Sequence, residues 1–276
     1  MATRPESLAE RAERELNDIL ARYAAGKAEV VRTYFAREHT PAEHVDMLRR
    51  QMGREVFCVA WLQRAARMSE NLERSTERHA FAALLKQIAE EVEHYTVLAD
   101  LAEWVLGRKL TAEEAREYEV YAAIDPDLPL ERHYNPRLPE ANAMIDVLYR
   151  FRNEYRSEFS DEVMHLTEGG GGGSFTEASR LRGDEFRERF AKAMARIVED
   201  EVEHGPLRVR GFARTWIRDE ADLALATRLL HEFMVQHVRV RNEIYGNPLS
   251  EERLAAIDRG EIEPWALPVP AEAAHA

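Results

Sequence analysis

The stretch Ala89-Glu90-Glu91-Val92-Glu93-His94 recurs further along the chain in a closely similar form, Glu199-Asp200-Glu201-Val202-Glu203-His204. Both copies contain the pattern Glu-x-x-His, with Glu91 and His94 in the first and Glu201 and His204 in the second. On an α-helix, residues three positions apart lie on the same face. Each copy therefore predicts a helix that presents one carboxylate and one imidazole to the same neighbourhood.

The pattern alone has little specificity. The chain has 39 Glu and 10 His among 276 residues, so chance yields about 1.4 such pairs, and the sequence contains four. Of the other two, Glu162 with His165 borders a glycine run and is expected at the surface, and Glu272 with His275 lies in the tail. The first two pairs differ because each comes late in a long amphipathic run and lies on its apolar stripe.

The composition limits the class of protein. With 45% hydrophobic and 32% charged residues, the composition suits one large globular domain or two small ones, and we expect a single domain over residues 1–276. A formal charge of −13 disfavours nucleic acid and anionic membranes as partners. The single cysteine, Cys58, excludes an internal disulfide and a built-in iron–sulfur centre, and it favours a cytoplasmic location. No apolar stretch reaches the length of a membrane span, and no secretory signal is visible.

Helix signals dominate, and alternating strand patterns are nearly absent, so the fold class is predicted to be all-α. Residues 6–38 are expected to form one or two helices, interrupted near Gly26. A capping box at Thr40 predicts a long helix to about residue 71, and a second long helix is expected over residues 75–106. A short helix is predicted to begin at Thr111.

The second half of the chain repeats this organisation after a proline-rich segment, residues 124–140. Its prolines forbid a continuous helix, and we interpret it as a crossover between two helix pairs, with a simple interdomain linker as the alternative. A third long helix is predicted over residues 139–168, ended by a flexible glycine run at 169–173. A fourth begins near Ser174 or near Asp184 and runs to about residue 203.

A last helix is predicted over residues 219–245, and the proline-containing tail is expected to be extended or disordered. His231, Glu232 and His237 on this helix are interpreted as interface or surface residues, with a place close to the metals as the alternative.

Glutamates on the first and third helices lie where they can join the Glu-x-x-His pairs. Glu55 interrupts an apolar stripe and precedes Glu91 by 36 residues. With a turn near residue 73, both lie roughly 27 Å from the turn, at about 1.5 Å per residue. On the third helix, the position level with Glu201 is near residue 151 if the fourth helix begins near Asp184, so Glu154 is the closest carboxylate and Glu158 the second choice. A start at Ser174 instead moves this level toward Asp146. Buried carboxylates without a cation cost many kcal/mol, so these glutamates require metals or paired arginines.

The order Glu, Glu-x-x-His, crossover, Glu, Glu-x-x-His resembles the ferritin-like di-iron carboxylate superfamily over about residues 41–210. The resemblance implies a four-helix bundle with a long crossover, to which this chain adds an N-terminal helical extension at 6–38 and the C-terminal helix at 219–245. The second hairpin departs from the family pattern through its longer, glycine-rich loop. The resemblance also implies two iron ions, or a manganese and an iron, with Glu91 and Glu201 as bridging ligands. The full ligand set would be Glu55, Glu91, His94, Glu154 or Glu158, Glu201 and His204.

The additions of about forty residues before the bundle and about seventy after it favour substrate oxidation over iron storage. We expect a non-haem di-iron oxidase or oxygenase that uses dioxygen and an external electron donor on a small or mid-sized organic molecule, as a monomer or a homodimer. The apolar pocket would be lined by Met52, Val59, Leu148, Phe151 and Phe190. The alternatives are a multimeric ferroxidase or iron store, and a metal-free helical interaction protein in which arginines pair with the stripe glutamates.

Overall fold

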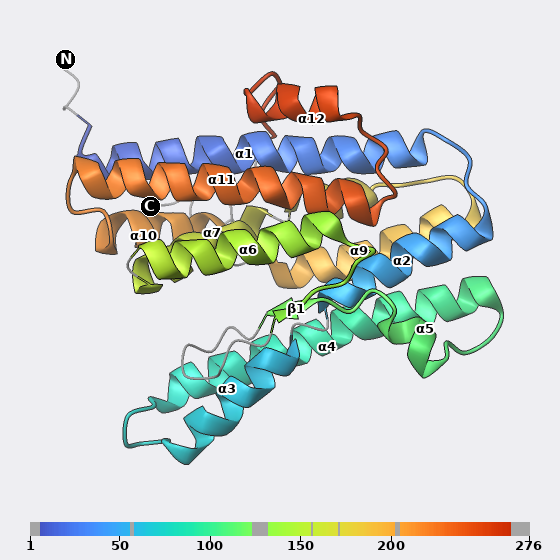
Figure 1. Cartoon of the computed structure of the whole chain (residues 1–276), viewed down its shortest axis with the longest axis horizontal. Coiled ribbons are helices and arrows are strands. Elements are labelled where there is room, and N and C mark those ends of the chain that lie inside the picture. The colour runs from blue at the N-terminus through green and yellow to red at the C-terminus, as the bar shows by residue number, and fades with distance from the viewer. Residues whose placement is uncertain are drawn as a thin grey trace. The chain divides into compact units, whose positions relative to one another are not determined.

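The computed structural model of the chain describes residues 6–122, 132–155, 157–170, 172–201 and 205–265, apart from 56–57 (Figure 1). These residues are mainly α-helical, which confirms the expected helical class. One antiparallel pair of very short strands is present: β1 (Tyr121–Ala122) lies just before the proline-rich segment, and β2 (Arg132–His133) lies within it. The ferritin-like topology of the bundle stays a prediction.

The chain divides into two compact units. Unit 1 consists of Met1–Arg37 and Asp146–Ala276, and unit 2 consists of Glu38–Ile145. Two separate segments of the chain therefore build unit 1, and the whole of unit 2 lies between them in the sequence.

Unit 2 is built on a helical hairpin. The predicted first long helix is present as α2 (Pro41–Glu55) and α3 (Cys58–Glu70), and the second as α4 (Arg78–Leu106). Both α2 and α3 pack against α4. The helix α4 ends at Gly107, whose φ of 67° is the left-handed conformation that glycine adopts easily. The short helix α5 (Ala112–Arg116) begins with the predicted capping box of Thr111 and Glu114.

Unit 1 is organised around α1 (Leu8–Phe35). This helix packs against α8 (Gly172–Ser179), α10 (Gly205–Thr215) and α11 (Glu220–Ile244), and α7 (Ser157–Gly170) packs against α10 and α11. The predicted interruption near Gly26 is wrong, because α1 is continuous there. A Cβ atom at Gly26 would lie 3.1 Å from Ile257 and 3.4 Å from Val238, so the glycine provides space for packing.

The helices α1 and α11 lie side by side and run in the same direction (Figure 1). Three contacts follow one another in the same order along both: Arg11 with Glu220, Tyr23 with His231, and Tyr34 with Tyr245. Two parallel neighbouring helices need a long connecting segment, because the chain must return to the starting end. The segment between α1 and α11 contains all of unit 2 and the other helices of unit 1 that precede α11.

Two predictions about the second half are wrong. The third long helix is divided into α6 (Pro139–Glu154) and α7, and no proline or glycine marks the break. The described glycines of the run are helical and do not form a flexible loop, because α7 ends at Gly170 and α8 begins at Gly172, whereas Gly171 lies outside the described residues. At Gly173 a Cβ atom would lie 2.0 Å from the carbonyl oxygen of Ala24. This part of the run therefore serves the close packing of α8 on α1.

The remaining helices follow local signals. The fourth long helix is α9 (Glu185–Glu201), whose first turn is capped by Asp184, the second of the two predicted starts. The last predicted helix is α11, capped by Asp219. Two helices were not predicted: α10, named above, and α12 (Glu251–Asp258), which begins at the cap Ser250 and packs against α1 and α11.

Candidate metal centre

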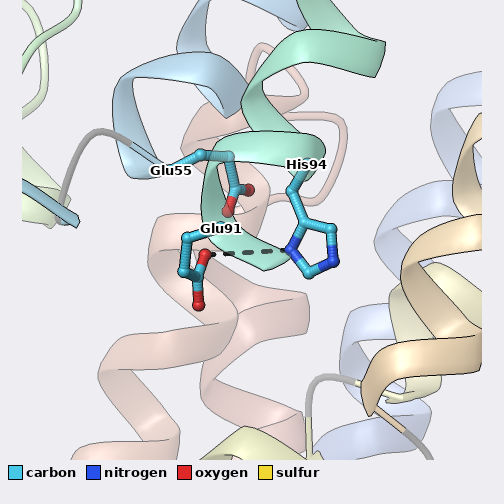
Figure 2. A group of neighbouring side chains, drawn as sticks. All are labelled: Glu55, Glu91 and His94. Atoms are coloured by element: carbon cyan, nitrogen blue, oxygen red, sulfur yellow. Dashed lines mark ion pairs between the residues drawn. The ribbon is translucent and has the colours of Figure 1, made fainter. Parts of the chain in front are cut away.

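The structure brings Glu55, Glu91 and His94 together within unit 2 (Figure 2). Glu55 is the last residue of α2, and Glu91 and His94 lie one turn apart on α4. Each side chain offers one ligand atom, and these three atoms all lie within 4.8 Å of one another. A carboxylate from α2 thus lies close to a carboxylate and an imidazole from α4.

Burial differs among the three side chains. Glu55 and His94 are buried, whereas the side chain of Glu91 is 24% exposed. Nδ1 of His94 is 3.8 Å from a carboxylate oxygen of Glu91, the contact drawn as a dashed line in Figure 2. Gln51, one turn before Glu55 on α2, donates a hydrogen bond from its amide nitrogen to the Glu55 carboxylate.

The environment of Glu55 disfavours its charged form. Burial, together with the nearby charge of Glu91, raises the pKa of Glu55 to about 7, although His94 and the hydrogen bond from Gln51 act in the opposite direction. At a pH near 7, about half of such carboxyl groups are protonated unless a cation stabilises the carboxylate.

No arginine or lysine forms an ion pair with Glu55 or Glu91 in the described part of the chain. The partners of these two carboxylates are Gln51, His94 and each other. Buried carboxylates need compensation, and two carboxylate oxygens with one imidazole nitrogen suit divalent iron, manganese or zinc. The residues present therefore fit a metal ion.

The other predicted ligands belong to unit 1. Glu154 at the end of α6 and Glu158 in the first turn of α7 are both exposed. Glu201 ends α9, and its side chain, like all of His204, lies outside the described residues. The contribution of the second Glu-x-x-His pair stays a prediction from the sequence.

The predicted pocket residues are also divided between the units. Met52 is fully buried on α2, and the side chain of Val59 lies outside the described residues. In unit 1, Leu148 is half-buried and Phe151 fully buried on α6. Phe190 on α9 lies 5.5 Å from the ring of Phe35 and 5.8 Å from that of Phe186, so it takes part in an aromatic core. That these five residues line one pocket stays a prediction.

A third Glu-x-x-His pair provides an internal comparison. Glu162 and His165 on α7 are 3.9 Å apart, and each side chain is 46% exposed. They form the surface pair expected from the sequence, with the same spacing as Glu91 and His94 but without burial or a third ligand. Burial beside α2 is what distinguishes the candidate centre.

Gln51 was missed in the sequence. It lies four residues before Glu55 and therefore on the same face of the helix, so a polar residue at that spacing on an apolar stripe was the available signal.

No family model matches this chain, and comparisons with curated proteins and with solved structures found no significant similarity. Within the described ranges, no helix has the length and apolar character needed to cross a membrane. The functional argument therefore rests on the residues of the candidate centre and on the sequence pattern around them.

Proposed function

We propose that this protein binds iron or manganese at Glu55, Glu91 and His94 and uses dioxygen to oxidise a small organic molecule. The observation that supports metal binding is a buried carboxylate, Glu55, which lies beside a second carboxylate and an imidazole. In the described part of the chain, neither Glu55 nor Glu91 has an arginine or lysine partner. The oxidase or oxygenase activity rests on the sequence, because the second Glu-x-x-His pair suggests a second metal.

Each residue has a defined role in this proposal. Glu55 and Glu91 supply carboxylate oxygens, and His94 supplies an imidazole nitrogen. Gln51 holds the Glu55 carboxylate through a hydrogen bond and limits its rotation. When bound, redox-active metal ions supply the electron transfer to dioxygen that protein side chains alone do not provide. The electrons come from an external donor, because one cysteine cannot hold an iron–sulfur centre.

The metal-free interaction protein is less well supported. It requires arginines beside the stripe glutamates, and the described surroundings of Glu55 and Glu91 contain none in an ion pair. Iron oxidation for storage is the alternative function of the same metal site. A large multimeric assembly on size-exclusion chromatography would favour this alternative.

Metal content tests the proposal directly. Protein reconstituted anaerobically with ferrous iron should contain two metal ions per chain if both Glu-x-x-His pairs contribute, and Glu91→Ala and Glu201→Ala should each reduce this content. Glu162→Ala is the matched control, because it removes the same kind of residue from an exposed pair. A content that falls only in Glu91→Ala would contradict the di-metal proposal and leave a mononuclear centre. No bound metal in the parent protein would contradict the function altogether.

A further inference from the structure

The helix α4 has apolar residues on two opposite faces. One face packs against α2 and α3 and buries Leu84, Ile88 and Leu98. The outer face carries Leu85 and Val92, which are 44% and 46% exposed. A helix at the surface of a soluble protein normally has polar residues on the side turned away from the core. Within the described ranges, the exposed large apolar residues all belong to unit 2, so this unit has the surface that calls for a partner.

Leu85 and Val92 belong to a continuous stripe on the outer face. Exposed residues follow one another at alternating spacings of three and four: Ala82, Leu85, Ala89, Val92 and Thr96. This spacing keeps all five on one side of the helix, and it is the pattern of a helix that packs along a second helix. Single exposed apolar residues are ordinary, whereas a contiguous stripe marks an interaction surface.

The charges beside the stripe indicate what this surface binds. One flank of the stripe carries a titratable residue at every seventh position, in the order His79, Lys86, Glu93 and Asp100. The first two are basic and the last two are acidic, so a second copy of α4 running in the opposite direction presents the complementary order. Lys86 of one copy then faces Glu93 of the other, and His79 faces Asp100 in the same way. A parallel copy forms none of these pairs, because it places each residue level with its own equivalent.

The sizes of the stripe residues fit the same antiparallel arrangement. When Lys86 faces Glu93, Ala89 of one copy packs against Val92 of the other. Leu85 packs against Thr96 in the neighbouring layers. Each larger side chain thus meets a smaller one, and the layers have similar volumes. In a parallel pair Ala89 would meet Ala89, which leaves space that a close-packed interface does not contain.

We propose that two copies of this chain form a symmetric dimer through the outer faces of their α4 helices, which lie antiparallel. Two-fold symmetry makes every contact occur twice. The side chain of Lys86 is 66% exposed although it lies 3.1 Å from Glu90 of the same helix, so it is accessible to Glu93 of the second copy. A single pair of helices is smaller than a standard interface of about 1,200–2,000 Å². The dimer is therefore reversible, with a dissociation constant in the micromolar range.

Sedimentation equilibrium of the full chain in the presence of a chelator tests this proposal. We expect a concentration-dependent dimer in the parent protein, weakened about tenfold or more by Leu85→Glu, which places a charge within the stripe. Ala83→Glu is the matched control, because Ala83 is also exposed on α4 but lies two positions away and therefore on another side of the helix. This control should leave the dissociation constant unchanged.

Charge reversal tests the antiparallel register. Lys86→Glu and Glu93→Lys should each weaken the dimer about tenfold, because each variant places two pairs of like charges opposite one another. The double variant with both changes restores opposite charges and should dimerise about as tightly as the parent protein.

Three results would overturn the proposal: a parent protein that stays monomeric well above micromolar concentration, a dimer that is equally stable in Leu85→Glu, or a double variant no tighter than the single ones. Circular dichroism of each variant establishes that it is folded. If Glu93→Lys were unfolded because it adjoins His94, Leu85→Glu and its control Ala83→Glu would still decide. The measurements use metal-free protein, so this proposal and the proposed function succeed or fail separately.

Discussion

Gly173 of α8 lies so close to Ala24 of α1 that a Cβ atom on the glycine would be 2.0 Å from the alanine carbonyl oxygen. Side chains normally separate packed helices, and here the backbones themselves meet. Since a backbone carbonyl cannot rotate away as a flexible side chain can, glycine is required at this position.

The first prediction is that Gly173→Ala lowers the free energy of unfolding by about 1–3 kcal/mol, the usual cost of inserting atoms into a packed interior. Gly211→Ala is the control, because Gly211 is also helical but has nothing within 4 Å of the added atom. The free energy of unfolding of Gly211→Ala should rise by about 0.5–1 kcal/mol, because alanine favours a helix more than glycine does. Urea denaturation measures both, and equal stability of the two variants would show that α8 does not pack on α1 in this way.

The second prediction concerns the effect of metal on unit 2. At a manganese concentration of a hundred times the dissociation constant, amide exchange through unfolding of α4 should slow about a hundredfold, because only the folded site binds the ion. His94→Ala should lose this protection. His165→Ala should keep it, since His165 belongs to the exposed pair on α7. Protection that survives in His94→Ala would place the bound ion elsewhere.

The third prediction follows from the pKa of Glu55, which burial and the charge of Glu91 raise from 4.5 to about 7. A pKa that is higher in the folded state contributes stability below the unfolded-state value, and this contribution is lost as the pH rises through the folded-state value. The metal-free protein should therefore become less stable between about pH 5 and pH 8. Thermal unfolding in the presence of a chelator measures this loss.

Glu55→Gln is the control for this pH dependence, because it replaces the carboxyl group with a neutral one of similar shape. It should flatten the dependence and make the metal-free protein more stable than the parent at the upper end of the range. Saturating metal should reverse the slope in the parent, since protons and metal compete for the same carboxylate. An unchanged slope in Glu55→Gln would assign the titration to another group.

The fourth prediction concerns the hydrogen bond between Tyr23 and His231, which joins the parallel helices α1 and α11 at 3.0 Å. Tyr23→Phe and His231→Phe should show a coupling of about 1 kcal/mol in a double-mutant cycle. The single His231→Phe change should cost more than Tyr23→Phe, because it leaves a buried hydroxyl without a partner. Additive effects would show that the two residues do not interact in solution.

The sequence predicts correctly what local chemistry determines. The end of the second long helix at residue 106, the start of the short helix at Thr111 and the start of the last helix near Asp219 each depend on residues within one turn. The meeting of Glu55 with Glu91 also follows from short-range information, since both lie equally far from the turn of one hairpin. All of these features can be predicted without knowing how distant segments of the chain pack.

The wrong or missing predictions concern features that depend on packing between segments far apart in the sequence. The glycine run looks like a loop in the sequence, because only the distant backbone of Ala24 shows that Gly173 provides space for close helix packing. The parallel pairing of α1 with α11 is equally absent from any local pattern. The helix α12 is a different case, because the cap at Ser250 was visible in the sequence and was missed.

The division of unit 1 into two chain segments has a consequence for synthesis on the ribosome. The helix α1 leaves the ribosome first, but its partners α8, α10 and α11 are all encoded after unit 2. At a translation rate of about 5–20 residues per second, α11 follows α1 by roughly 10–40 s. Unit 2 is continuous in sequence and can fold during this interval, while the nascent α1 waits with its apolar residues uncovered. Chaperone binding during translation is therefore expected to concentrate on α1.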